Sequence, residues 1–340
     1  MKIIIKILSV ASAVLFAQDD FFEPGYSIGG YGEMHYDMEA NNGDGKLDFH
    51  RYIFYIKHQF NPEWSMMSEV EVEHNMVYTD PADDPDGGYL AMEQAHLNYW
   101  NGTWGFKGGV VLVPAGIINE YHEPPTFMSV ERPEYNKNII PTTWFDNGFQ
   151  FYGSVGDINL MYSMTGDLDG DGVGAGIRSA RMKGVYSTTA DWTKTFQISW
   201  AGMEGLKVGG SVTMNDAPKD DGTTVGVNLT EFNATYSKNN MYARLENGNI
   251  SYTDNASAES SSGYYLDLGY DIAGLVGCGD GKNLYLWMRN SAYNTDDQGE
   301  DTEISLFGIT YKPTNNISIK FETGSKDDSD IMRMGIGYMF

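Results

Sequence analysis

Three glutamates at alternate positions, Glu69, Glu71 and Glu73, form an acidic row within the stretch WSMMSEVEVEHN. The stretch before it, HRYIFYIKHQF, carries Arg51 and Lys57 on one side of its own alternating pattern. If both stretches are strands that pair, these charges share one face, because residues two apart in a strand point the same way. Opposed charges across a narrow space create a transverse field that orients dipolar solutes and selects ions by charge. The alternative is that they are ordinary solvated ion pairs.

A second pattern, DLDGDG, resembles the start of a calcium-binding loop. Asp167, Asp169 and Asp171 occupy its first, third and fifth positions, and Gly172 occupies the sixth. The twelfth position, which requires a bidentate glutamate, holds Arg178, and no helical period follows. A solvated turn therefore explains the pattern better, and the three aspartates are weak metal candidates.

The sequence offers little support for catalysis. Its six histidines belong to no H-E-x-x-H pattern, and C-x-x-C does not occur. The one cysteine, Cys278, has no partner for an internal disulfide. A formal net charge of −25 excludes nucleic acid as a partner, because phosphates would be repelled. We therefore expect neither an enzyme nor a cofactor.

The elements that must position these residues are β-strands, because apolar and polar residues alternate along most of the chain. Roughly sixteen segments of about ten residues, each close to the length of a membrane-crossing strand, lie between Tyr26 and Phe340. A half-buried sheet produces this alternation whether its apolar face meets a protein core or lipid. The lengths of the connections between the segments distinguish a sheet that faces a protein core from one that faces lipid.

The connections alternate between short and long. Short ones are expected at 61–63, 101–103, 155–157, 201–205, 238–240 and 313–315, with 273–281 as a longer exception. Longer polar ones are expected at 38–46, 79–88, 113–147, 166–190, 215–224, 253–262, 294–302 and 324–330. A barrel with a periplasmic and an extracellular end has this asymmetry, and a sandwich has no reason for it. The sequence predicts an all-β fold, a transmembrane antiparallel β-barrel of about 16 strands.

Both ends of the chain support export to a membrane. Residues 1–17 have the basic start and short apolar stretch of a signal peptide, with cleavage expected after Ala17 or, alternatively, Ala13. The mature barrel is then 18–340. Aromatic residues cluster beside the short connections, as in an interfacial girdle. The final strand, MRMGIGYMF, must close against the first strand, which leaves no free edge, and its terminal Phe340 is expected to anchor at the girdle.

Two stretches resemble a known family. The terminal GIGYMF looks like the signal by which outer-membrane barrels are recognised for assembly, and residues 105–153 resemble the phosphate-selective porin O and P family of Gram-negative outer-membrane porins. The latter match includes a G-x-x-x-x-P-x-G-like turn and an F-M-x-x-E-R segment, and GIRSARMKG (176–184) adds to it. The resemblance implies a 16-stranded barrel, usually a homotrimer, whose third extracellular loop, here 113–147, folds inward as the constriction loop.

The expected function is therefore that of a porin for passive diffusion of small hydrophilic solutes and ions, with selectivity set by charged lumen and loop residues. Residues expected to line the pore or its constriction are Arg51, Lys57, Glu69, Glu71, Glu73, His96, Lys107, Glu120, His122, Glu123, Glu131, Arg132, Arg289 and Arg333. His96 contributes polarity, whereas His122 is a titratable group in the inward loop.

Two alternatives remain open. A phosphate- or anion-selective porin would need a ladder of basic residues, and the seven arginines here are offset by many glutamates. A structural or adhesive surface barrel is the other, although the apolar, proline-rich content of 113–147 favours a loop folded inside. The expected surroundings are outer-membrane lipid and lipopolysaccharide, and Phe340 would engage the barrel assembly machinery.

Overall fold

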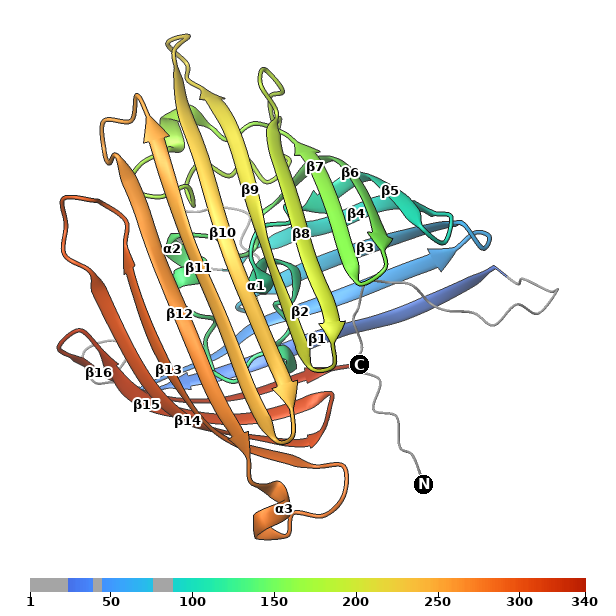
Figure 1. Ribbon diagram of the computed structural model, residues 1–340, viewed down its shortest axis with the longest axis vertical. Helices are drawn as coiled ribbons and strands as arrows, with labels where there is room; N and C mark the ends of the chain where they lie inside the picture. Colours follow the sequence, from blue (N-terminus) through green and yellow to red (C-terminus); the bar gives the residue numbers. More distant parts are fainter. Residues whose placement is uncertain (1–23, 39–44, 76–87) are drawn as a thin grey trace.

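Sixteen antiparallel strands close into one barrel, in which β1 is hydrogen-bonded to both β2 and β16 (Figure 1). This computed structural model describes residues 24–38, 45–75 and 88–340. The predicted signal peptide, 1–17, lies outside these ranges, as do most of the predicted connections 38–46 and 79–88. Within the described residues, no helix has the length and apolarity to cross a membrane. The predicted all-β barrel is confirmed.

The strands follow one another around the barrel in sequence order. Their bounds are β1 Gly25–Asp37, β2 Lys46–Gln59, β3 Trp64–Glu73, β4 Leu90–Trp100, β5 Trp104–Leu112, β6 Phe145–Val155, β7 Ile158–Thr165, β8 Thr193–Met203, β9 Leu206–Pro218, β10 Thr224–Lys238, β11 Met241–Thr253, β12 Ser260–Asp271, β13 Asn283–Asn294, β14 Thr302–Thr314, β15 Ile317–Lys326 and β16 Ser329–Met339. Each strand pairs only with its neighbours, so every edge is satisfied.

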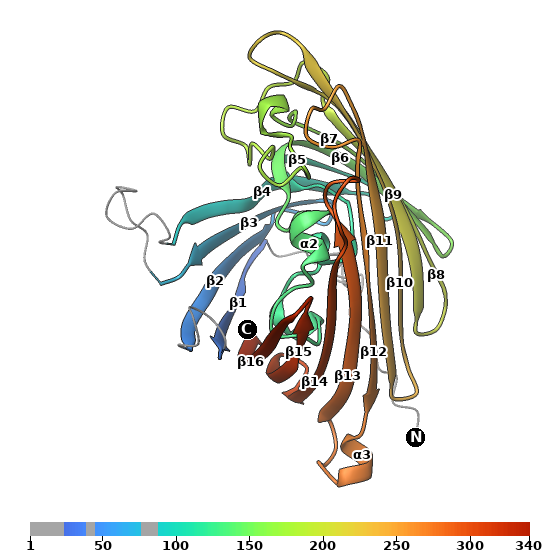
Figure 2. The same cartoon turned by 90° about the vertical axis from the view of Figure 1, so that its left-hand side faces the viewer.

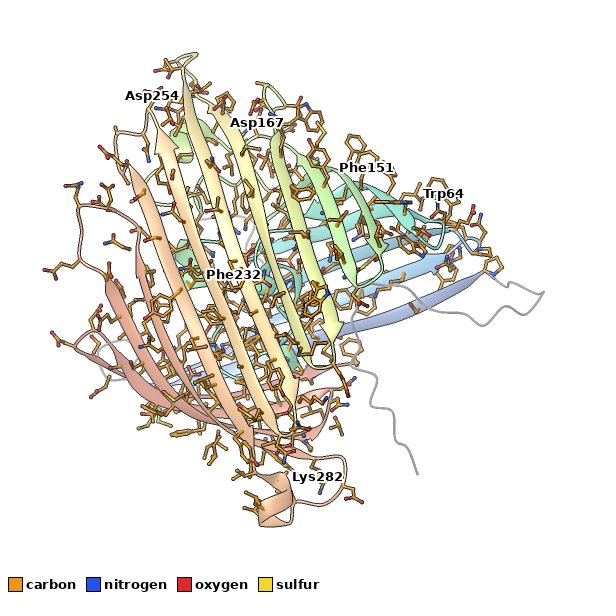
Figure 3. The ribbon with its side chains drawn as sticks, viewed as in Figure 1. Trp64, Phe151, Asp167, Phe232, Asp254 and Lys282 are labelled. Atoms are coloured by element: carbon orange, nitrogen blue, oxygen red, sulfur yellow. The ribbon has the colours of Figure 1, made fainter. Side chains whose placement is uncertain are left out.

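The connections differ at the two ends of the barrel. One end has short connections at 60–63, 101–103, 156–157, 204–205, 239–240 and 315–316, together with 272–282, which contains α3 Ala273–Val276. The other end has 113–144, 166–192, 219–223, 254–259, 295–301 and 327–328 among its described connections. In Figure 3, Asp167 and Asp254 lie at this second end and Lys282 at the first.

One predicted connection is much shorter than expected. Residues 324–330 were expected to form a long polar loop, but β15 and β16 extend through them and leave only 327–328 as a turn. Ser325 pairs with Asp330, and Lys326 pairs with Ser329. The prediction failed because the strands continue past the apolar band into polar sequence, where hydrophobic alternation no longer marks a strand.

The outer face of the barrel is apolar and the inner face is polar. Phe151 and Phe232, which Figure 3 shows on the outside of the sheet, are 51% and 52% exposed. On β10, the neighbours of Phe232, Glu231 and Asn233, are each only 7% exposed and face inward. A continuous apolar outer band would be strongly unfavourable in water, so its natural surroundings are hydrocarbon.

The C-terminal residue closes the barrel against the first strand. The backbone N–H of Phe340 donates to the Gly30 carbonyl at 3.0 Å, and the Gly30 N–H donates to the Phe340 carbonyl at 3.1 Å. The Phe340 ring stacks on Tyr52, with centroids 5.9 Å apart. Gly30 permits this approach, since a Cβ there would lie 2.9 Å from the tip of the Phe340 ring.

Between β5 and β6 the chain turns into the barrel. Residues 113–144, the inner loop, contain three short helices: α1 Ile117–Glu120, η1 Pro124–Thr126 and α2 Tyr135–Asn138. Figure 2 shows α2 between the β1–β4 side of the barrel and the β10–β13 side. The loop predicted at 113–147 therefore ends slightly earlier, where β6 begins.

The inner loop packs closely against the barrel. Its side chains Ile118, Phe127 and Ile139 are fully buried. Gly337 of β16 leaves room for Pro124, because a Cβ on that glycine would lie 2.2 Å from the Pro124 Cβ. The loop is therefore fitted to the inner face of particular strands.

Candidate functional site

Lysines on β14 and β15 hold one side of the inner loop. The Lys320 ammonium donates to the carbonyl oxygens of Pro124 and Ser129, both at 2.7 Å, and lies 3.9 Å from the Phe127 ring centroid. Lys312 Nζ donates to the Pro125 carbonyl at 2.6 Å. Lys320, which faces inward as the alternation of its strand predicts, is thus engaged with the loop backbone.

Carboxylates complete this attachment. Glu322 on β15 accepts a hydrogen bond from the Val130 backbone N–H at 2.7 Å. Glu246 on β11 accepts from Asn136 Nδ2 at 3.1 Å and also from the Ile117 backbone N–H. Loop carbonyls thus meet cations and loop N–H groups meet anions, which are the strong charge-assisted combinations.

The opposite side of the loop meets β3 and β4 through His122. Its Nε2 atom lies 3.5 Å from Glu69 Oε1 and 3.6 Å from Glu93 Oε2. Thr143, at the end of the loop, donates its hydroxyl to Glu93, and Arg132 donates to the His122 carbonyl at 3.1 Å. His122, Glu69 and Glu93 are all buried.

Glu93 was missed by the sequence analysis because of a β-bulge. Glu69 pairs with Gln94, but Val70 pairs with Met92, so Glu93 is the extra residue. Strict alternation places Gln94 inward and Glu93 outward, whereas a bulge turns both toward one side. Two consecutive polar residues in an otherwise alternating strand were the available signal.

The predicted acidic row shares a face with Arg51. Arg51 Nε lies 2.8 Å from Glu33, Nη1 lies 3.2 Å from Glu71, and Nη2 lies 3.9 Å from Glu73. The guanidinium therefore has three carboxylate neighbours, and one of them, Glu33, was missed. Lys57, also predicted to oppose the row, pairs across from Met67.

Other ion pairs line the inner face. Arg289 donates to both carboxylate oxygens of Asp267, at 2.6 and 2.7 Å. Arg333 approaches Asp37 at 3.2 Å and Glu322 at 3.3 Å. Asp267 was not among the predicted site residues, since period two alone does not distinguish a paired lumen residue from a free one.

His35 joins a further part of the inner loop to the barrel. Its Nδ1 lies 2.7 Å from Glu131 and its Nε2 lies 3.1 Å from Glu33. The His35 ring stacks on His50, with centroids 4.9 Å apart. Sequence analysis found Glu131 but missed His35, because a lone histidine in a strand carries no distinguishing signal.

A cavity lies on each side of the inner loop. The short-connection cavity, of about 350 Å³, is lined by residues that include Lys57, His96, Lys107, Glu120 and Glu123. The long-connection cavity, of about 390 Å³, is lined by His50, Arg51, Glu73, His74, Glu131, Arg132, Pro133, Glu134, Asn136, Lys137, Thr142, Arg178 and Arg333. Except for Glu71 and Arg289, the residues predicted to line the pore therefore divide between these two spaces.

Positive charge is concentrated around the long-connection cavity. Four of the seven arginines of this acidic protein line it, namely Arg51, Arg132, Arg178 and Arg333. Burial lowers the pKa of Arg178 and, assisted by the charge of Arg178, lowers the pKa of Arg181 to about 10.

The three aspartates of the calcium-like pattern do not converge. The buried Asp167 carboxylate accepts from the Ala190 N–H at 2.6 Å and from Asn215 Nδ2 at 3.0 Å. Asp169 caps η2 Gly170–Gly172 by accepting from the Asp171 N–H. Within the described ranges, the carboxylate and histidine groups whose ligand atoms do converge lie elsewhere.

The fold places this chain in one structural class, the outer-membrane β-barrels that share the porin fold. An anion-selective porin from Comamonas acidovorans superposes with a TM-score of 0.63 at 9% identity, covering 94% of this chain and 100% of that chain. OmpF of Salmonella typhi gives 0.58 at 13% identity, covering 93% and 97%. An in-vitro folded trimer form of OmpT, an outer membrane protein of Vibrio cholerae, gives 0.59 at 12%, covering 93% and 99%.

Within that class, the chain belongs to the same family as an uncharacterized protein of Aquifex aeolicus (strain VF5). The two are 30% identical over 355 residues, covering 93% of this chain and 80% of that protein. No family model matches the chain, so its resemblance to the phosphate-selective O and P porins is supported at the level of the porin fold.

Proposed function

We propose that this protein is an outer-membrane porin, a water-filled channel for passive diffusion of small hydrophilic solutes and ions. The observation that carries the proposal is the inner loop inside a closed barrel, with a polar cavity on each side of it. The fold shared with proteins described as porins supports it. A barrel built only to display loops would not need a constriction attached by so many buried charges.

Single-channel recording tests this proposal. The purified folded barrel, added to a planar lipid bilayer, should produce discrete and uniform current steps. Heat-denatured protein is the control and should produce none. A structural or adhesive barrel filled by its inner loop would insert without discrete current, and that result would reject the porin function.

A preference for anions is the second candidate, and the ring of arginines around the long-connection cavity favours it. A lumen that concentrates one sign of charge raises the local concentration of the opposite ion. The charged residues around both cavities would then set selectivity together. In a salt gradient, the reversal potential should indicate anion preference, and the double variant R132Q/R178Q should reduce it. An unchanged reversal potential would reject this role for the arginines.

We further propose that residues 1–17 are a cleaved signal peptide and that the mature chain resides in the outer membrane as a homotrimer. The apolar outer band and the inserted Phe340 ring support membrane residence and recognition by the barrel assembly machinery. N-terminal sequencing of the exported protein and its native mass in detergent test the cleavage and the trimer. Deleting Phe340 should reduce insertion more than it changes the conductance of inserted barrels.

A further inference from the structure

Three potential metal-ligand atoms converge where the inner loop meets β3 and β4. They are Glu69 Oε1, Glu93 Oε2 and His122 Nε2, and all three lie within 4.8 Å of one another. The side chains of the two glutamates are 0% exposed and that of the histidine is 2% exposed. Within the described part of the chain, none of the three atoms has a hydrogen-bond partner. Buried polar atoms left in this way are costly unless something lies between them.

The hydrogen bond of the other imidazole nitrogen, His122 Nδ1, indicates what kind of species could lie between the three atoms. His122 Nδ1 lies 3.1 Å from the carbonyl oxygen of Asn119, which can only accept a hydrogen bond. Nδ1 therefore carries a proton, and in the neutral ring Nε2 then presents a lone pair. This lone pair points at two carboxylates, so three electron-rich atoms face a common centre. A cation at that centre would satisfy all three.

The outward atoms of both carboxylates are fixed by separate partners. Glu69 Oε2 accepts from Gln94 Nε2 at 2.5 Å, and Glu93 Oε1 accepts from the Thr143 hydroxyl. Each carboxylate thus keeps one oxygen for the centre while the other is held in place. The ligands of a metal site are usually oriented by hydrogen bonds from an outer shell of residues. Here a carbonyl accepts from the imidazole, and an amide and a hydroxyl donate to the carboxylates.

We propose that Glu69, Glu93 and His122 together bind one divalent first-row transition-metal ion, for which Zn²⁺ is the test ion. Ligands about 2.0–2.1 Å from a tetrahedral ion lie about 3.4 Å from one another, close to the observed 3.5 and 3.6 Å. A protonated imidazole bonded directly to a carboxylate would be nearer, at about 2.7–2.9 Å. The nitrogen ligand disfavours Ca²⁺ and Mg²⁺, which prefer all-oxygen sites.

An entry path and a further coordination position are available. Glu69, His122 and Glu123 also line the short-connection cavity of about 350 Å³. A water in that cavity, or the carboxylate of Glu123, would complete the coordination. Since His122 belongs to the inner loop and the two glutamates to the barrel, the ion would fasten the loop to the β3–β4 side.

A second histidine cluster serves as the internal competitor. Asp48, His50 and His74 also bring ligand atoms together. There, however, one carboxylate already accepts from both rings, at 3.0 and 2.9 Å. Its atoms have partners without an ion, so we assign the metal to the other site.

Equilibrium dialysis tests the assignment without reference to conductance. The folded full-length barrel is first stripped of metal with a chelator. On dialysis against Zn²⁺ it should then bind one equivalent. The variants E93Q and H122Q should bind Zn²⁺ at least about tenfold more weakly. Losing a partner that only supports a ligand already costs about tenfold or more in metal affinity, and these variants lose a ligand itself. The control H58Q removes a histidine whose ring packs against Tyr26 and Phe60, and H74Q disrupts the competing cluster. Both should keep the full equivalent. Binding abolished by H74Q but retained in H122Q would overturn the proposal.

X-ray absorption on the unmodified protein gives a readout that does not depend on a variant folding. Zn²⁺ at the proposed site should show one imidazole among its ligands. Two imidazoles would indicate one of the two clusters that contain His50, either with Asp48 and His74 or with His35 and Glu131. A shell of oxygen atoms alone would indicate adventitious surface binding. Either result would reject the site, as would the absence of stoichiometric binding.

Discussion

Two sides of the barrel hold the same inner loop by different means. On the β14–β15 side, Lys312, Lys320 and Glu322 bond directly to backbone atoms of the loop, at 2.6 to 2.7 Å. On the β3–β4 side, Glu69 and Glu93 face a loop histidine across 3.5 and 3.6 Å. The first attachment is complete as it stands. On the second side the Thr143 hydroxyl donates to Glu93, but the contact of His122 with the two glutamates would be completed by the proposed cation. A basic residue that faces a lumen is therefore not necessarily free to attract a passing anion.

The largest expected decrease in the free energy of unfolding comes from a substitution on the β14–β15 side of the loop attachment. Lys320→Met removes two hydrogen bonds that a charged ammonium donates to loop carbonyls. Each such bond is worth about 1.5–3 kcal/mol, so the free energy of unfolding should fall by at least about 3 kcal/mol. Urea unfolding of the barrel in lipid or detergent measures this. Open-channel noise should also rise as the loop loosens.

Lys194→Met is the matched control for Lys320. Lys194 pairs with Asp191 at 2.8 Å, and both side chains are about one-third exposed. Its loss should cost about 0–1 kcal/mol. Equal destabilisation by the two substitutions would show that the loop attachment is no stronger than a surface ion pair.

Removal of Zn²⁺ by a chelator should produce the next largest decrease in the free energy of unfolding. This decrease should come only from the β3–β4 side of the loop attachment. With free Zn²⁺ at one hundred times its Kd, the bound ion should add about 2.7 kcal/mol to the free energy of unfolding. Unfolding of wild-type protein with Zn²⁺ and with EDTA measures the difference. The E93Q variant, with binding at least about tenfold weaker, should show no more than about half of this difference, and an equal response in both proteins would remove the contrast between the sides.

Sequence was sufficient for the architecture but not for either attachment. Alternation and connection length predicted the barrel because both follow from the membrane itself, which fixes strand length and the apolar face. The inward position of Arg51 and Glu71 followed from the same period. Which of these side chains would bond to the loop depended on the path of residues 113–144, and this path has no sequence period.

Glu93 illustrates a different limit. Its inward position depends on a register shift between β3 and β4, and such a shift inverts the alternation that predicts facing. His122 was recognised as a titratable loop residue, but neither of its carboxylate partners could be assigned from spacing. A site assembled from two strands and a loop exists only after the chain has folded.

A smaller effect is expected from the neighbouring lysine on the complete side. Lys312 donates to one loop carbonyl, whereas Lys320 donates to two. Lys312→Met should therefore reduce the free energy of unfolding by about 1.5 kcal/mol, roughly half the effect of Lys320→Met. The same urea titration applies. A cost equal to or above that of Lys320→Met would show that carbonyl bonds are not the source of the attachment.

The smallest effect concerns ion selectivity and compares two lysines near the loop. Lys137 is exposed in the long-connection cavity, whereas Lys312 is bonded to the Pro125 carbonyl at 2.6 Å. An engaged ammonium has its field partly cancelled by the carbonyl dipole and offers fewer free donors. Lys137→Gln should shift the reversal potential toward cation preference by at least about twice as much as Lys312→Gln. Equal shifts would mean that lumen charge acts on passing ions regardless of its hydrogen-bond partner.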